Sequence, residues 1–108
     1  MVRIATLASG AGSNFKRLLE EHNSHPLSAE FVGLIVDRSD TGAALVATEN
    51  EIPVTLLEYN SFNHRADFDA TLLQALEQLQ PDLIIGAGFM RILPQAIIER
   101  FENRIINL

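Results

Sequence analysis

The sequence of 108 residues contains no cysteine. This absence excludes disulfides, thiolate catalysis and metal sites with cysteine ligands. No stretch reaches the roughly 18 apolar residues that a membrane-spanning helix needs. The apolar run at the N-terminus is too short for a secretory signal and is typical of a first strand instead. We therefore expect a cytoplasmic protein that has no membrane partner.

Basic residues are also scarce, with eight Lys and Arg against fourteen Asp and Glu and a net charge of −6. A nucleic-acid groove needs clustered Lys and Arg to displace counterions, and the chain has no basic run. An acidic protein can still bind a single phosphate if backbone N–H groups form the site. Because 47% of the residues are apolar, a packed globule is expected rather than a disordered chain. The composition thus favours small-molecule substrates over nucleic acid.

Apolar runs typical of strands alternate with segments of helical periodicity along the whole chain. We expect strands at residues 2–8, 30–37, 53–57, 83–88 and 104–108. We expect helices at residues 14–22, 40–50, 65–80 and 94–101. This β-α-β-α-β-α-β-α-β order predicts an α/β fold with an open, mostly parallel, doubly wound (Rossmann-like) sheet. Residues 1–108 should form a single domain, and the fifth strand at its end leads us to expect the first part of a longer protein.

In such sheets, ligands bind at the carboxyl ends of the strands. The first strand ends at the loop Gly10 to Asn14, with the sequence GAGSN. Two glycines permit a tight turn, Ser13 and Asn14 supply hydroxyl and amide donors, and the start of the helix offers free N–H groups. These features suit one terminal phosphate. A plain strand-to-helix turn in which Ser13 or Asn14 only caps the helix would use the same residues.

The glycine loop also resembles part of the dinucleotide fingerprint G-x-G-x-x-G. In that pattern the third glycine lets the helix pack closely on the strand, but Phe15 occupies its position here. Asp37, at the end of the second strand, would suit a ribose hydroxyl, so a nucleotide-cofactor-binding Rossmann domain stays open as an alternative. The Walker pattern fails because no Gly-Lys-Ser/Thr sequence follows the loop.

Two further strand ends carry unusual residues, the segment GFMRIL at residues 88–93 and Asn107. An apolar surface with one Arg could line the site of a flat heteroaromatic ligand that carries a carboxylate. Met90, Ile92 and Leu93 could equally be core residues. Asn107 ends a strand that we expect to be buried, where a buried amide needs a hydrogen-bond partner. That partner could be backbone, or an oxyanion formed during a reaction.

The histidines do not indicate a metal site. His22 and His25 lie three positions apart, but no third ligand is evident. His64 and Arg65 lie in a polar loop before a helix, where solvated capping residues are common. We therefore expect no metal.

Together, the segments LASGAGSN, GFMRILP and RIINL resemble the phosphoribosylglycinamide formyltransferase family, the folate-dependent enzymes of purine synthesis. The resemblance covers essentially the whole chain. It implies that Gly12, Ser13 and Asn14 bind the phosphate of glycinamide ribonucleotide. It also implies contacts to the formyl donor, 10-formyltetrahydrofolate, from Arg65, Met90, Arg91, Ile92, Leu93 and Asn107. A homodimer is kept open as an assembly.

In the chemistry that the resemblance implies, the substrate amine attacks the formyl carbon and Asn107 donates a hydrogen bond to the tetrahedral oxyanion. In the family, a histidine two residues after this asparagine acts as general acid, and a later aspartate keeps it protonated. Both positions would lie beyond Leu108. We therefore expect an enzyme of this family whose 108-residue chain is inactive by itself.

Other functions share some of these features. A formyltetrahydrofolate hydrolase, or another folate-dependent formyltransferase such as one acting on charged tRNA, would look similar around the folate site. The glycine loop favours a small phosphorylated substrate, and the acidic charge disfavours tRNA. A receiver domain fits the length and the βα alternation, but it needs an acidic pair where this chain has Ser9 and Gly10. It also needs a lysine after the fifth strand, and the only lysine is Lys16.

Overall fold

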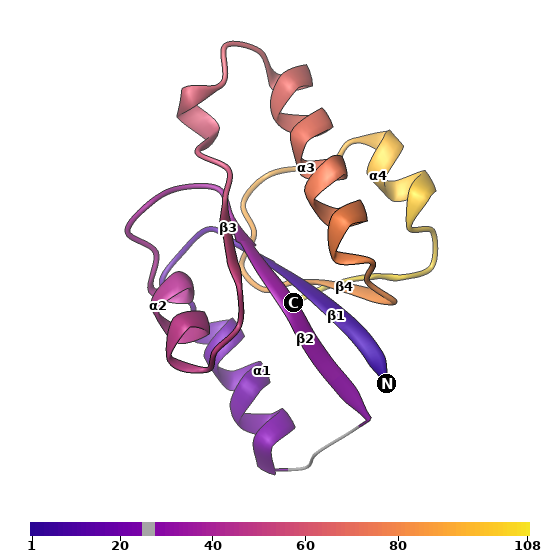
Figure 1. The fold of residues 1–108 in the computed structure, drawn as a ribbon. Coiled ribbons are helices and arrows are strands. Elements are labelled where there is room, and N and C mark those ends of the chain that lie inside the picture. The colour runs from indigo at the N-terminus through magenta and orange to yellow at the C-terminus, as the bar shows by residue number, and fades with distance from the viewer. Residues whose placement is uncertain (25–27) are drawn as a thin grey trace.

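The computed structural model describes residues 1–24 and 28–108, which form a five-stranded parallel sheet with helices on both faces (Figure 1). The strands are β1 (Val2–Ala8), β2 (Ala29–Val36), β3 (Val54–Leu56), β4 (Leu83–Gly86) and β5 (Ile105–Asn107). The helices are α1 (Ser13–Ser24), α2 (Gly42–Glu49), α3 (Arg65–Leu79) and α4 (Gln95–Arg100). The α/β, Rossmann-like architecture expected from the sequence is confirmed.

The ends of the helices follow from local residue chemistry. Thr41 caps α2, and its Oγ1 accepts a hydrogen bond from the N–H of Ala44 at 3.2 Å. Pro94 precedes α4, where its missing N–H costs no helical hydrogen bond. The loop at residues 58–63 contains a short 3-10 helix, η1 (Tyr59–Ser61), which the sequence pattern did not predict. Within the described ranges, no helix combines the length and the apolar character needed to cross a membrane.

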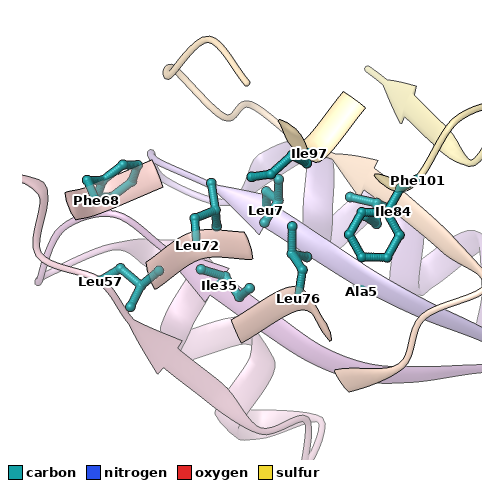
Figure 2. Close-up of a cluster of buried hydrophobic side chains, with 10 residues drawn as sticks. All are labelled: Ala5, Leu7, Ile35, Leu57, Phe68, Leu72, Leu76, Ile84, Ile97 and Phe101. Atoms are coloured by element: carbon teal, nitrogen blue, oxygen red, sulfur yellow. The ribbon is translucent and has the colours of Figure 1, made fainter. Parts of the chain in front are cut away.

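Among the described residues, three apolar clusters attach the helices to the sheet, the smallest being Ile4, Ala29 and Ile85, and the two larger ones lie on opposite faces. One cluster lies between the sheet and the helices α3 and α4 (Figure 2), and it contains Ala5, Leu7, Ile35, Leu57, Phe68, Leu72, Leu76, Ile84, Ile97 and Phe101. The other lies toward α1 and α2 and contains Ala8, Phe15, Leu19, Leu34, Val36, Ala43, Ala47, Ile52 and Ala87. Successive side chains of a strand point to opposite faces, so neighbours such as Leu34 and Ile35 join different clusters. Strands covered on both faces are apolar nearly throughout for this reason.

The strand β5 is less covered than the sequence leads us to expect. Ile106 and Asn107 are both exposed, so the expectation of a buried strand end is wrong for these residues. The physical reason is the place of β5 at the edge of the sheet, where it pairs with β4 alone.

The direction of winding reverses between β1 and β4. The strand order is β3-β2-β1-β4-β5, so the chain first builds the sheet outward from one side of β1 and then from the other. Loops that leave the carboxyl ends of β1 and β4 therefore run to opposite faces, and the crevice between such loops is the usual ligand site of open α/β sheets. The glycine loop follows β1, and the segment 87–93 follows β4.

Leu72 is buried in the cluster under α3 and offers a test of this packing. Leu72→Ala should lower the free energy of unfolding by about 2–5 kcal/mol, because the lost side chain leaves a cavity that the surroundings fill only in part. Urea denaturation followed by circular dichroism measures the change. Gln74→Ala, at an exposed position of the same helix, should change it by less than about 0.5 kcal/mol. Equal losses in the two variants would contradict the packing.

Candidate active site

The glycine loop between β1 and α1 packs closely against the start of α2. Gly12 is buried and has a φ of +87°, and a Cβ at this position would lie 2.5 Å from the backbone N and Cα of Ala43. From the other side, a Cβ on Gly42 would overlap the carbonyl oxygen of Ala11. A Cβ on Gly10, in contrast, would meet nothing within 4 Å. The contact therefore needs glycine at positions 12 and 42. No motif in the sequence points to Gly42.

The same loop presents free hydrogen-bond donors at the start of α1. The carbonyl of Gly12 accepts a hydrogen bond from the N–H of Lys16 at 2.8 Å, which closes the first helical turn. In the described part of the chain, the N–H groups of Ser13 and Asn14 have no protein acceptor, as is usual for a first turn. Both side chains are exposed. The start of α1 thus offers unpaired backbone donors next to a hydroxyl and an amide, the kinds of group that bind anions at helix starts.

Ser9 joins the glycine loop to the segment after β4. Its Oγ accepts a hydrogen bond from the N–H of Met90 at 2.8 Å, and its N–H donates to the carbonyl of Gly88 at 3.3 Å. The side chain of Asn14 lies beside the same segment, because its Nδ2 would be 4.0 Å from a Cβ on Gly88. The two loops predicted to bind ligands are therefore adjacent.

A cavity of about 730 Å³ opens along the segment after β4, within the range of small-molecule sites. Its lining comprises Leu7, Gly86, Phe89, Met90, Arg91, Ile92, Leu93, Ile98, Phe101, Glu102, Asn103, Ile105 and Asn107. Met90 is 77% exposed and Ile92 is 83% exposed, so the alternative that they are core residues is wrong. Leu93 is partly buried and packs against the cluster under α3 and α4.

Asn107 lies at the same cavity, beside Gly86 of the neighbouring strand. The two residues are paired in register, and a Cβ on Gly86 would overlap the Oδ1 of Asn107. Glycine at position 86 thus leaves room for the amide. The amide is exposed, and no hydrogen bond to it is found among the described residues, so it is available to a ligand.

Arg91 is held inside the protein by two groups. Its Nε donates to the Oδ2 of Asp37 at 2.6 Å, and its Cζ lies 3.7 Å from the centroid of the Tyr59 ring. Asp37 is only 1% exposed, so the ion pair is largely shielded from water. The N–H of Tyr59 donates to the carbonyl of Asp37 at 2.9 Å, which fixes the ring beside the carboxylate. A dinucleotide-binding domain needs this carboxylate for a ribose, and here it already binds an arginine.

Arg65, at the start of α3, reaches the same segment from the other side. Its Nη2 donates to the carbonyl of Ile92, and its Nε donates to the Oδ1 of Asp69 at 2.8 Å. The carboxylate of Asp69 raises the pKa of the Arg65 guanidinium above its usual value. The Cζ of Arg65 lies 5.7 Å from the centroid of the Tyr59 ring. Both candidate arginines therefore approach Tyr59, a residue of a loop with no motif.

The described histidines do not line the cavity. His22 lies at the last turn of α1 and packs edge-on against Phe31, with ring centroids 5.3 Å apart. His64 is the exposed residue before α3, and its side chain makes no capping hydrogen bond. His25 lies outside the described residues. In residues 1–24 and 28–108, no group of three or more His, Cys, Asp or Glu side chains could hold a metal ion.

Comparisons with known proteins place this site in a family. A family model described as formyl transferase matches residues 2–108. The chain belongs to the formyl transferase family. The phosphoribosylglycinamide formyltransferase of Haemophilus influenzae is 29% identical over 108 residues, which cover 100% of this chain and 51% of that protein. The trifunctional purine biosynthetic protein adenosine-3 of Gallus gallus is 29% identical over 107 residues, 99% of this chain and 11% of that protein.

Solved structures of formyl transferase proteins share the fold. The phosphoribosylglycinamide formyltransferase of Coxiella burnetii superposes with a TM-score of 0.91 at 31% identity, over 98% of this chain and 50% of that chain. Glycinamide ribonucleotide transformylase 1 of Symbiobacterium toebii superposes with a TM-score of 0.90 at 29% identity, over 99% of this chain and 50% of that chain. The chain thus spans about half the length of these bacterial relatives. The family indicated by the sequence motifs is confirmed.

Gly12 and Gly10 form a matched pair for testing the glycine loop. Gly12→Ala should lower the free energy of unfolding by about 1–2 kcal/mol through the positive φ alone, and further through the overlap with Ala43. Gly10 has neither a positive φ nor a close neighbour. Gly10→Ala should leave stability unchanged or raise it by up to about 1 kcal/mol, because alanine restricts the unfolded chain. Urea unfolding measures both, and similar losses in the two variants would contradict a close contact specific to Gly12.

Proposed function

We propose that this chain provides the phosphate loop, the folate-binding wall and one catalytic residue of a phosphoribosylglycinamide formyltransferase. Such an enzyme transfers a formyl group from 10-formyltetrahydrofolate to the amine of glycinamide ribonucleotide in purine biosynthesis. The observation that carries the proposal is the adjacency of two loops, one rich in free donors and one beside an apolar cavity that reaches Asn107. The names of the relatives support the choice of substrates.

Gly12, Ser13 and Asn14 would bind the phosphate of glycinamide ribonucleotide. The unpaired N–H groups of Ser13 and Asn14 support this role, because they carry the partial positive charge of a helix N-terminus. Their exposed side chains add a hydroxyl and an amide donor. A site of this kind depends on backbone groups, so the net charge of −6 does not oppose it.

Arg65 and the wall formed by residues 90–93 would bind 10-formyltetrahydrofolate. The exposed side chains of Met90 and Ile92 offer apolar contacts to a flat ring system at the edge of the cavity. The backbone between them is tied to other elements, which supports a preformed surface. Ligand sites that are mostly apolar with a few fixed polar groups match this description.

Asn107 would act on the reacting carbonyl. The amine nitrogen of glycinamide ribonucleotide attacks the formyl carbon, and the carbonyl electron pair moves to the oxygen. The exposed amide of Asn107 would donate a hydrogen bond to that oxyanion. When the oxyanion re-forms the carbonyl and the carbon–nitrogen bond to the folate breaks, the leaving nitrogen takes a proton and the attacking nitrogen releases one. An amide does not supply this proton at neutral pH, so a general acid in addition to Asn107 would be needed.

Anion binding tests the phosphate loop. Inorganic phosphate at millimolar concentration should shift the amide NMR signals of Gly12, Ser13 and Asn14 before others, because their donors are unpaired. The start of α3 is an internal control, since it is a helix start without a side-chain cap and without a glycine loop. No response in a folded sample would contradict the phosphate site, and so would an equal response at both helix starts.

Substrate binding and turnover test the whole proposal. Calorimetry should detect binding of glycinamide ribonucleotide and of 10-formylfolate, a stable oxidised form of the donor, but not of NAD. The 108-residue chain by itself should release tetrahydrofolate at least about 10²–10⁴-fold more slowly than a complete enzyme, the usual contribution of general acid–base catalysis. Turnover near the roughly 10 s⁻¹ typical of enzymes would show that the general acid lies within these 108 residues. Binding of NAD without folate would contradict the function itself.

A further inference from the structure

Asp37 is a buried carboxylate with an incomplete set of partners. Its Oδ2 contacts the Nε of Arg91 at 2.6 Å, whereas its Oδ1 is buried without a hydrogen-bond partner in the described part of the chain. A buried charge is tolerated only when an opposite charge and hydrogen bonds compensate it. Arg91 therefore compensates the buried charge of Asp37. The side chain of Arg91 is 29% exposed.

The guanidinium of Arg91 lies between this carboxylate and an aromatic ring. The Cζ-to-centroid distance of 3.7 Å to Tyr59 is short for a cation–π contact. The ring is itself anchored to Asp37, because the N–H of Tyr59 donates to the Asp37 carbonyl at 2.9 Å. The carboxylate of Asp37 thus holds Arg91 directly, and the backbone carbonyl of the same residue helps to place the ring against which Arg91 packs.

Three consecutive residues of the wall are each tied to a different part of the fold. The N–H of Met90 donates to Ser9 after β1, and the carbonyl of Ile92 accepts from Arg65 in α3. Arg91, between them, binds Asp37 after β2. The side chains on either side of Arg91 remain exposed toward the cavity. The ion pair therefore holds the backbone from which these apolar side chains project.

We propose that Asp37 is a positioning residue for the folate-binding wall, and that Arg91 acts as a brace of that wall and not as a ligand of the folate carboxylates. This inference rests on the proposed function. A ligand carboxylate that drew Arg91 away would leave Asp37 buried without compensation and would remove the guanidinium from the Tyr59 ring. The cost of breaking this ion pair favours a brace over a ligand that follows the glutamate part of the donor.

The first test needs no ligand. Asp37→Asn should raise the hydrogen-exchange rate of the Met90 amide by about tenfold or more, because the segment opens locally. It should also change the emission of Tyr59, which is the only tyrosine in a chain without tryptophan. The matched control Glu77→Gln removes an exposed ion pair with Arg100 and should leave both signals unchanged. Unchanged exchange and emission in folded Asp37→Asn would overturn the proposal.

A double variant covers the case in which Asp37→Asn does not fold. Asp37→Asn combined with Arg91→Gln removes both charges, so that no uncompensated ion stays buried. It should show the same faster exchange at Met90 and the same change in Tyr59 emission. Wild-type exchange in this folded double variant would overturn the proposal.

The second test separates a brace from a carboxylate ligand. The affinities of 10-formylfolate and of its glutamate dimethyl ester are measured for the wild type and the double variant. If Arg91 is a brace, both affinities should fall by the same factor in the double variant, and their ratio should stay constant within about twofold. Loss of affinity for the acid alone would make Arg91 a carboxylate ligand and overturn the proposal. If the wild type binds neither probe, the proposed function fails, while hydrogen exchange and Tyr59 emission still decide the role of Asp37.

Discussion

The hydrogen bonding of β1 to two neighbours determines where every other part of this molecule lies. On one side it pairs with β2 and on the other with β4, and its side chains enter the apolar layers on both faces of the sheet. Because the ladders extend to the ends of the strands, the residues that follow β1 and β4 meet side by side. Ser9 then bonds to the backbone of Gly88 and Met90. The site is a direct result of strand register.

The second constraint is electrostatic. The chain carries a net charge of −6, yet its candidate site is built around two arginines and the ring of Tyr59. Each arginine has an acidic partner, Asp37 in one case and Asp69 in the other. Both cations therefore have fixed positions before any substrate arrives. This arrangement uses charge to shape a surface.

The fold was accessible from the sequence because its signals are local. The strand expected at residues 30–37 and the helix expected at residues 65–80 depend on near neighbours, and both agree closely with β2 and α3. The glycine loop and the segment at residues 88–93 were also singled out from the sequence, since glycines and strand ends mark them, and the structure places them side by side. The exposure of Asn107 was missed, because edge position is a property of the whole sheet.

The interactions of Asp37 were missed for a related reason. Its carboxylate meets a residue 54 positions later in the chain, and no spacing rule connects the two. Tyr59 lies in a loop without periodicity, so only the three-dimensional structure shows that two arginines gather around it. Gly42 is a similar case. It must lack a side chain because a Cβ would overlap the carbonyl oxygen of Ala11, which lies on another loop. Long-range backbone contact leaves no trace in a single sequence.

The close contact of Gly12 with the start of α2 has an entropic consequence. A loop whose backbone is already packed against a neighbouring helix loses little conformational freedom when a ligand arrives, and such preorganisation increases affinity without adding contacts. The donors of Ser13 and Asn14 are therefore held in place by the contact of their loop with α2. Under the proposed function, residues of α2 would therefore influence phosphate binding through the rigidity of this contact.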